Sequence, residues 1–424
     1  MLMKLNYFLS LGVIIFLLGG MIPTHAQNAG IYSKGTWSYD VNQGFSAKFF
    51  SDKRDGDKYG NSVLTHADLW ALYFPVNHFA VGLWYDHNRS RDKNTEYKST
   101  NISSSNVGYL ELMYGRSFGN FNLQAWGAAG IGQAKYKYEG YETTNTEKDK
   151  LFNWMIGLES PFKVASGCNG YVTPGISYES DKGKWDGGDD KYNYFDIYLN
   201  LMFFVPTHDY YCDIGQGCSA VSERYHQGYA SLGVSTWIDL SFGNYKSHWE
   251  DETGNSTLQM DQSENDFCGS INGYYYVIDN LAVGAQLKLD TYKYKSNDDA
   301  VYKTDQSGTA FTFMPQVLYN LPLQGCLNNL FVDAGFGLGV DNSKSTSGSY
   351  TTDTKENITQ FYAGAGYNYF FTNFLAFTPK IGFESQTNKT KNPDGPDIKD
   401  NKSGPTIEIG LNYFFGGKQA VRYH

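Results

Sequence analysis

The sequence predicts an all-β protein, a transmembrane antiparallel up-and-down β-barrel, from three observations. Apolar and polar residues alternate with a period of two along most of the chain after residue 27, which places them on opposite faces of strands. The alternating segments run to about 10–14 residues, longer than soluble strands and long enough to cross a bilayer. Tight turns alternate with long polar segments, as expected for short periplasmic turns and longer external loops.

The alternation is clearest in residues 194–204, 230–242 and 281–290. In the first of these, Phe195, Ile197 and Leu199 point one way, and Asp196 and Tyr198 point the other. The apolar face is expected to meet lipid and the mixed face to line the interior. The predicted interior positions include bulky side chains, namely Trp84, Trp126, Tyr198 and Trp237.

The connections predict which end of the barrel is which. Residues 75–78, 277–280 and 371–373 are short turns, whereas residues 51–61, 87–103, 244–266 and 385–403 are expected to be long polar loops. A soluble β-sandwich gives no reason for this asymmetry. The abundant Tyr and Phe, 35 and 28 residues, fit aromatic girdles at the two membrane interfaces, and residues 136–138 and 292–294 (both Tyr-Lys-Tyr) are expected to be interfacial anchors.

Composition excludes three other classes of protein. A mean hydropathy of −0.47 is too polar for a bundle of transmembrane helices. An aromatic content of 17% is too high for a disordered chain. A net charge of −10 argues against nucleic-acid binding, which needs clustered Lys and Arg.

The N-terminus has the layout of a secretory signal peptide. Lys4 precedes an apolar run over residues 7–22, and Thr24 and Ala26 supply small residues before a cleavage expected between Ala26 and Gln27. The mature chain is therefore expected to be exported and to lie in the outer membrane. No Cys follows the cleavage point, which argues against a lipid anchor.

The five cysteines do not form a disulfide framework. Cys212 and Cys218 enclose a flexible five-residue stretch, so a local disulfide between them is expected, with a pair of free thiols as the alternative. A zinc site is disfavoured because no second Cys or His pair completes four ligands.

An ordered set of matches indicates one unit duplicated in tandem. Residues 172–180 resemble residues 377–385, residues 79–82 resemble 281–284, residues 130–132 resemble 337–339, and residues 196–204 resemble 406–415. Eight strands are expected in each half. The predicted organisation is a signal peptide (residues 1–26), a first eight-strand unit (27–206), a periplasmic linker (207–227) and a second eight-strand unit (228–424).

Three short motifs resemble the outer membrane protein β-barrel family of Gram-negative envelopes. They are Lys34-Gly35-Thr36-Trp37, Asn280-Leu281-Ala282-Val283-Gly284 after a tight turn, and the aromatic ending Tyr413-Phe414-Phe415. The resemblance implies small eight-stranded barrels that contact outer-membrane lipid and lipopolysaccharide and are assembled by the insertion machinery. The tail over residues 416–424 departs from the family, whose chains usually stop close to the final aromatic residue.

Two architectures are compatible with eight strands per half. The sequence favours two tandem eight-stranded barrels with interiors filled by side chains; the alternative is one sixteen-stranded barrel with an aqueous channel. The linker and the repeated closing strand favour separate closure. Duplicated hairpins can nevertheless merge into one wider barrel without any change of sequence.

No catalytic or cofactor motif is found. Asp86-His87 and Ser247-His248 are isolated dyads expected to be solvated, and no G-x-S-x-G, H-E-x-x-H or P-loop pattern occurs. The acidic stretch with Asp186, Asp189 and Asp190 is a weak calcium candidate. The expected function is therefore a non-enzymatic, structural or loop-presenting outer-membrane protein without a cofactor. The alternative is a porin for small hydrophilic solutes.

Overall fold

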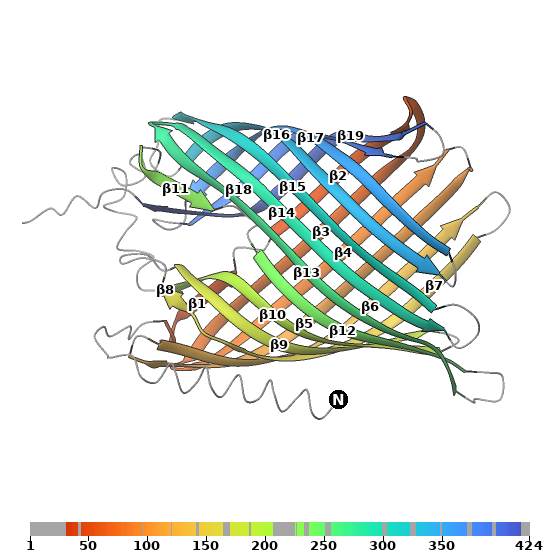
Figure 1. Cartoon of the computed structure of the whole chain (residues 1–424). Helices are drawn as coiled ribbons and strands as arrows, with labels where there is room; N and C mark the ends of the chain where they lie inside the picture. Colours follow the sequence, from red (N-terminus) through yellow and green to blue (C-terminus); the bar gives the residue numbers. More distant parts are fainter. Residues whose placement is uncertain are drawn as a thin grey trace, which may run out of the picture.

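The computed structural model describes residues 31–40, 44–95, 97–119, 121–140, 144–163, 170–185, 188–206, 225, 227–232, 237–250, 256–298, 303–322, 328–347, 350–370, 375–391 and 396–416. Within these residues, nineteen β-elements form one continuous antiparallel sheet that closes on itself (Figure 1). No helix in this part of the chain is both long and apolar enough to span a membrane.

The elements follow one another as hairpins along the chain. Their bounds are β1 (Thr36–Asp40), β2 (Gly44–Arg54), β3 (Asp57–Val76), β4 (Phe79–Asn94), β5 (Ser99–Phe118), β6 (Phe121–Glu139), β7 (Thr144–Glu159), β8 (Phe162–Lys163), β9 (Gly170–Trp185), β10 (Gly188–Pro206), β11 (Tyr229–Leu232), β12 (Trp237–Glu250), β13 (Ser256–Ile278), β14 (Leu281–Asp298), β15 (Lys303–Pro322), β16 (Asn328–Ser347), β17 (Tyr350–Phe370), β18 (Leu375–Thr390) and β19 (Ile398–Gly416).

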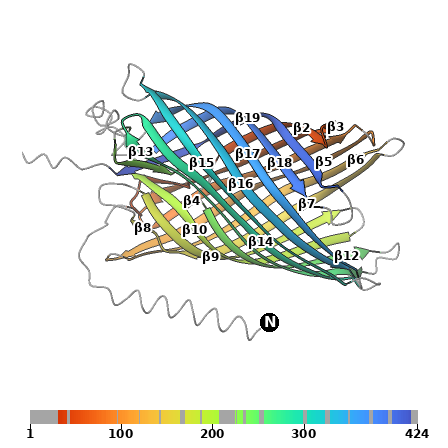
Figure 2. The ribbon, with the colours of Figure 1, turned by 45° about the horizontal axis from the view of Figure 1, so that its top comes forward.

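These elements make a closed barrel of sixteen strands, because β1 and β2, β7 and β8, and β11 and β12 are successive pieces of single strands. The strands form the barrel wall and are strongly tilted relative to the barrel axis (Figure 2). The last strand meets the first where β19 pairs with β2, from Asp400 opposite Arg54 to Gly410 opposite Gly44. The two halves are joined where β10 pairs with β12. The favoured expectation of two separate eight-stranded barrels is thus replaced by the sixteen-stranded alternative, since backbone hydrogen bonds bridge the halves on both sides.

At the end where β1 begins and β19 ends, however, two strands change partners. β1 pairs with β10, the last strand of its own half, whereas β2 pairs with β19 of the other half. The second half repeats the exchange, since β11 pairs with β19 and β12 pairs with β10. Figure 1 shows β1 beside β10, whereas β2 lies between β19 and β3. The barrel is therefore single over most of its length and divided into two lobes at this end.

The two lobes pack against each other through an apolar contact that we call the septum, formed by Leu201, Phe203, Leu375 and Tyr413. Phe203 on β10 and Tyr413 on β19 place their ring centroids 4.7 Å apart. Phe203 shares a strand face with Ile197, which is 36% exposed on the outer surface, yet Phe203 is only 2% exposed. The outward face of β10 thus changes from a lipid-facing surface to a buried one along a single strand.

The outer surface elsewhere carries an apolar belt. Leu83, Ile131 and Ile381 are 69%, 74% and 64% exposed, as expected for side chains that face lipid. Tyr136 and Tyr292, expected to be interfacial anchors, are 43% and 39% exposed, but they share their strand faces with Trp126 and Lys288, which line the lumen. Where the structure describes them, the segments expected to be long polar loops are mostly paired strands. β2 and β3, for example, turn through Asp55 and Gly56 alone, both with positive φ, because a two-residue turn with left-handed residues matches the strand twist.

The polar hairpins identify the outer end of the barrel. The last nine residues of β4 (residues 86–94) and the last seven of β16 (341–347) contain no apolar side chain and remain in register with their neighbours. They project beyond the apolar belt on the side opposite the lobes. In outer-membrane barrels the longer extensions face the exterior, so the lobed end is the periplasmic end.

The septum predicts an energetic coupling between the halves. Phe203→Ala and Tyr413→Ala should each destabilise the folded barrel by about 3–5 kcal/mol, because each removes a buried aromatic ring. The double variant should show a coupling of about 0.5–1.5 kcal/mol, as for a direct ring contact. Urea unfolding of the protein refolded in lipid vesicles measures both quantities.

Ile197→Ala is the matched control, since it lies on the same face of β10 but meets lipid. It should cost less than Phe203→Ala. Strict additivity of the two aromatic substitutions would mean that the lobes do not touch.

Candidate functional site: the divided lumen

The lumen contains one cavity of about 900 Å³ lined by strands of both halves. Its lining includes Met202 and Phe414, which belong to apolar clusters near the periplasmic ends of the first and second lobes, respectively. Both lobes therefore open into the same cavity. No catalytic residue set or cofactor-shaped cleft is evident in the described lining. The properties of the cavity therefore depend on the hydrogen bonds and charges of the side chains that line it.

The wall of the first half pairs carboxylates with indoles. The Trp70 indole Nε1–H donates to Glu111 at 2.5 Å, and the Trp84 indole donates to Asp68 at 2.6 Å. Glu111 is 4% exposed. A buried carboxylate needs such donors, because an unpaired buried charge is far more costly than a hydrogen-bonded one. The Trp84 ring also stacks on Tyr109, with centroids 4.4 Å apart.

A second network lies closer to the periplasmic end of the same wall. Tyr198 donates to Glu159 at 2.5 Å and accepts from the Trp126 indole at 3.3 Å, while the Gln124 amide also donates to Glu159. The Tyr198 ring lies against Gly175 of β9, where the Cβ of any larger residue would overlap the ring. This glycine lets the Tyr198 ring lie flat on the wall.

The wall of the second half is organised around Lys380. Its ammonium group lies 2.8 Å from Asp333 and 3.9 Å from Glu408, and 4.2 Å from the centroid of the Tyr362 ring. Tyr274 donates a further hydrogen bond to Asp333 at 3.2 Å. Lys48 on β2 pairs with Glu384 at 2.8 Å and so ties the first strand of the barrel to β18.

The two walls consequently differ in charge balance. The lining residues between His66 and Met202 include five carboxylates and no Lys or Arg, namely Asp68, Glu111, Glu159, Glu179 and Asp196. The lysines of the described lining are Lys48, Lys288 and Lys380, and each has a carboxylate within 3.0 Å. In the first wall, four of these acids accept hydrogen bonds from neutral donors, namely Asp68, Glu111, Glu159 and Asp196, whereas Lys380 in the second wall makes ion pairs.

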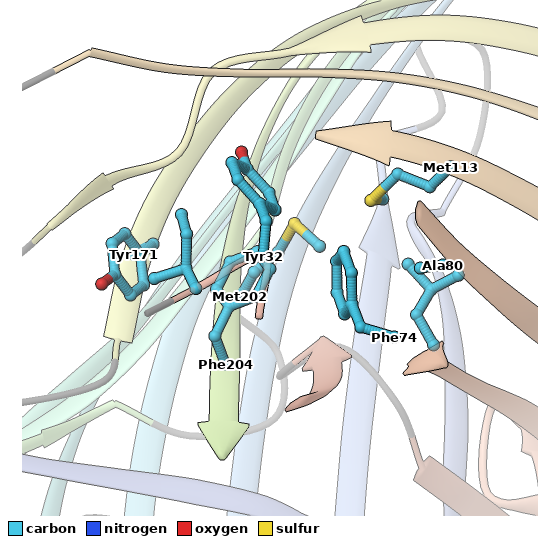
Figure 3. Close-up of a cluster of buried hydrophobic side chains, with 9 residues drawn as sticks. Tyr32, Phe74, Ala80, Met113, Tyr171, Met202 and Phe204 are labelled. Atoms are coloured by element: carbon cyan, nitrogen blue, oxygen red, sulfur yellow. The ribbon is translucent and has the colours of Figure 1, made fainter. Parts of the chain in front are cut away.

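A cluster of buried apolar side chains closes the periplasmic end of the first lobe (Figure 3), and we call it the first floor cluster because it forms the floor of the cavity. It consists of Ile31, Tyr32, Leu72, Phe74, Ala80, Met113, Tyr171, Met202 and Phe204. Tyr32 lies before the first strand, so the chain enters the lobe before it joins the wall. The Tyr32 ring meets Phe204 edge-on, with centroids 5.9 Å apart and an interplanar angle of 84°.

The second floor cluster repeats this arrangement with other residues. It consists of Tyr225, Tyr276, Ala282, Leu318, Phe331, Phe370, Ala376 and Phe414. Tyr225 again precedes the first strand of its half and meets Phe414 edge-on, at 6.0 Å and 87°. In both halves an aromatic residue from the preceding segment thus occupies the lobe.

Matching main-chain hydrogen bonds hold the two preceding segments. Gly35 N–H donates to Phe74 at 2.8 Å, and Gly228 N–H donates to Tyr276 at 2.9 Å. Both glycines have positive φ, 87° and 96°, a conformation that glycine adopts without steric cost. The Tyr32 and Tyr225 carbonyls accept from the N–H groups of His78 and Asn280, the last residues of the facing turns, at 2.7 and 2.6 Å.

Several sequence-predicted residues are placed by the structure. Trp84, Trp126 and Tyr198 line the cavity as expected; the side chain of Trp237 lies outside the described part. Asp86 and His87 are neighbours on β4 and so point to opposite faces. His87 contacts Asn106 at 2.7 Å and Thr65 at 3.2 Å, whereas Asp86 accepts from Asn88 at 3.0 Å. The two residues therefore do not form a dyad. The side chains of Ser247 and His248 are not among those described.

Only some of the residues predicted for metal binding, a disulfide or signal-peptide cleavage lie within the described residues. Asp189 and Asp190 begin β10, where Asp190 accepts a hydrogen bond from Tyr245 at 2.5 Å, while Asp186 lies outside the described residues. No group of three potential ligands suited to a metal ion occurs within the described ranges. Ala26, Gln27, Cys212 and Cys218 also lie outside them, as does nearly all of the expected linker.

Sequence reasoning missed the two floor tyrosines and the Lys380 site. A usable signal existed for the tyrosines, because Tyr32 and Tyr225 each stand three residues before a glycine, Gly35 and Gly228, at the same distance from the first strand of each half. Lys380 had no such signal. Its partners Asp333 and Glu408 come from two other strands, 47 and 28 residues away in the sequence.

Comparison with known proteins supports the fold and the location. The family model described as "Outer membrane protein beta-barrel domain" matches residues 325–424. No curated protein matches the chain. Together, the family match and the closed sixteen-strand barrel identify an outer-membrane β-barrel protein.

Several solved structures show remote similarity to the chain. The monoaromatic hydrocarbon channel CymD matches at 8% identity and a TM-score of 0.31, covering 91% of this chain and 90% of that one. A FadL homologue from Pseudomonas aeruginosa matches at 11% and 0.30, covering 93% and 99%. An outer membrane channel from Pseudomonas putida F1 matches at 11% and 0.28, covering 92% and 100%.

The Lys380 site predicts a contrast between two lysines that face the same cavity. Lys380→Met should destabilise the barrel by about 3–5 kcal/mol, because it leaves the 2%-exposed Asp333 side chain without its cation. Lys288→Met, which removes an exposed pair with Asp290, should cost at most about 1 kcal/mol. Urea unfolding in lipid vesicles compares them, and equal losses would contradict the assigned role of Lys380.

Proposed function

We propose that this protein is a non-enzymatic integral outer-membrane barrel that is closed toward the periplasm and presents a polar vestibule and projecting hairpins to the exterior. The observation that carries the proposal is the pair of floor clusters, in which Phe74, Phe204 and Phe370 are at most 2% exposed. Buried, close-packed aromatic residues leave no room for a water column. In this conformation the lumen is a vestibule without an exit.

The recurring contacts also support an origin by tandem duplication of an eight-strand unit. Tyr32 with Phe204 and Tyr225 with Phe414 make the same edge-on contact, and Gly35 and Gly228 make the same turn. In this proposal the duplicated halves exchanged partners at their outer ends and kept their own pairing at the periplasmic end. The signal peptide ending at Ala26, and contacts with lipopolysaccharide and with the insertion machinery, belong to the same proposal.

A porin for small hydrophilic solutes is the second candidate. The sixteen-strand wall favours it, because barrels of that size usually enclose an aqueous channel, as does the cavity of about 900 Å³ with its many polar lining residues. The two functions differ in whether the floor clusters block passage in the resting protein.

Conductance of the refolded mature protein in a planar lipid bilayer distinguishes them. We expect no steady conductance from protein that is shown by heat-modifiable gel mobility to be folded and inserted. A variant with residues 251–255 replaced by a short Gly-Ser turn should be equally silent, because the block lies at the other end of the barrel. Steps near a nanosiemens from the wild-type protein would instead establish the porin.

A further inference from the structure

Building on the proposed closed state, we propose that the two lobes are separate exits from one vestibule and that Tyr32 and Tyr225 are the plugs of the two exits. The structure would then hold a two-exit channel in its closed form. Three features of the described residues carry this inference: the shared cavity, the septum between the lobes, and the way in which each plug is attached.

The shared cavity and the septum define the two exits. Met202 of the first floor cluster and Phe414 of the second both line the cavity, so a solute in the vestibule reaches either floor. Below that level Phe203 and Tyr413 pack between the lobes, and each lobe has its own closing strand pair, β1 with β10 and β11 with β19. A solute that passes one floor therefore leaves through that lobe alone.

The first plug is attached in a way that permits withdrawal. Tyr32 lies four residues before Thr36, where β1 begins, so its removal from the lobe breaks no strand pairing. The main chain of Tyr32 is held by its carbonyl, which accepts a hydrogen bond from His78 N–H at 2.7 Å. Three residues later, Gly35 N–H donates to the Phe74 carbonyl. The Tyr32 hydroxyl is buried and has no hydrogen-bond partner among the described residues. Burying an unpaired hydroxyl is unfavourable, and this cost reduces the free energy that holds the Tyr32 side chain in the lobe.

The second plug is bound by equivalent ties. The Tyr225 carbonyl accepts from Asn280 N–H at 2.6 Å, and the ring contacts Tyr276 and Phe370 edge-on at 5.8 and 6.2 Å. β11 begins at Tyr229, again four residues after the plug. Because the two plugs are built alike and separated by the septum, each should open its own lobe without opening the other.

The test compares three variants in planar bilayers. Tyr32→Ala/Phe204→Ala removes the edge-on pair that fills the first floor, Tyr225→Ala/Phe414→Ala removes the pair of the second, and a third variant carries all four substitutions. We expect one conductance level from each double variant and about twice that conductance from the quadruple variant, in two separable steps. Leu83→Ala/Leu110→Ala, which changes two lipid-facing residues of 69% and 53% exposure, is the matched control and should behave as the wild-type protein.

Two outcomes would overturn the proposal. One is a double variant that already gives the full conductance of the quadruple variant in a single step, because the exits would then be undivided. The other is a quadruple variant that is folded and inserted yet silent. Conductance of the wild-type protein tests the closed resting state separately, since a conducting wild type whose current falls into two equal levels would refute that state and retain the two exits.

A second pair of variants covers the case in which the double substitutions prevent insertion. The Tyr32 ring lies against Gly115 so closely that a Cβ there would overlap it. Gly115→Val should therefore displace the first plug without removing any aromatic residue from the chain, and Tyr225→Ala removes the second plug alone. We expect one conductance level from each, and silence from both in the folded protein would contradict the proposal.

Discussion

The exchange of partners by two strands is the constraint on which the rest of this structure depends. β1 and β11 pair within their own halves, and their continuations β2 and β12 pair across to the other half. Backbone hydrogen bonds in lipid must be satisfied internally, so a strand that leaves one partner must take up another at once. The exchange satisfies that condition twice and produces a wall that is single at one end and divided at the other.

The divided end explains features that neither simple architecture accounts for. A plain sixteen-strand barrel has an interior too wide for side chains to fill, whereas an eight-strand barrel is filled by them. Each lobe has the smaller girth and is filled by one aromatic floor cluster. The vestibule above has the larger girth and keeps a cavity of about 900 Å³. The septum follows from the same geometry, because the outer faces of the lobes turn toward each other and must be apolar.

The sequence predicted the strands and their faces but not the partner exchange. Alternation placed Ile197 and Tyr198 on opposite faces correctly, because a period of two requires nothing beyond the strand itself. The same alternation could not separate Ile197, which faces lipid, from Phe203, which faces the septum, since both environments select apolar residues. The hairpins were mistaken for loops because both of their faces are polar. The hydrogen bond from Trp70 to Glu111 joins residues 41 positions apart in the sequence, a pairing that local pattern does not encode.

The most direct test of the divided barrel is disulfide cross-linking of Tyr39 in intact outer membranes, with the five native cysteines replaced by serine. Tyr39 lies opposite Phe203 of β10 in the structure. If β1 simply continued the pairing of β2 with β19, in which Gly44 faces Gly410, Tyr39 would instead lie opposite Phe415. Opposed antiparallel positions are close enough for a disulfide. The divided barrel predicts that Tyr39→Cys/Phe203→Cys cross-links on oxidation and that Tyr39→Cys/Phe415→Cys does not; the reverse result would contradict it.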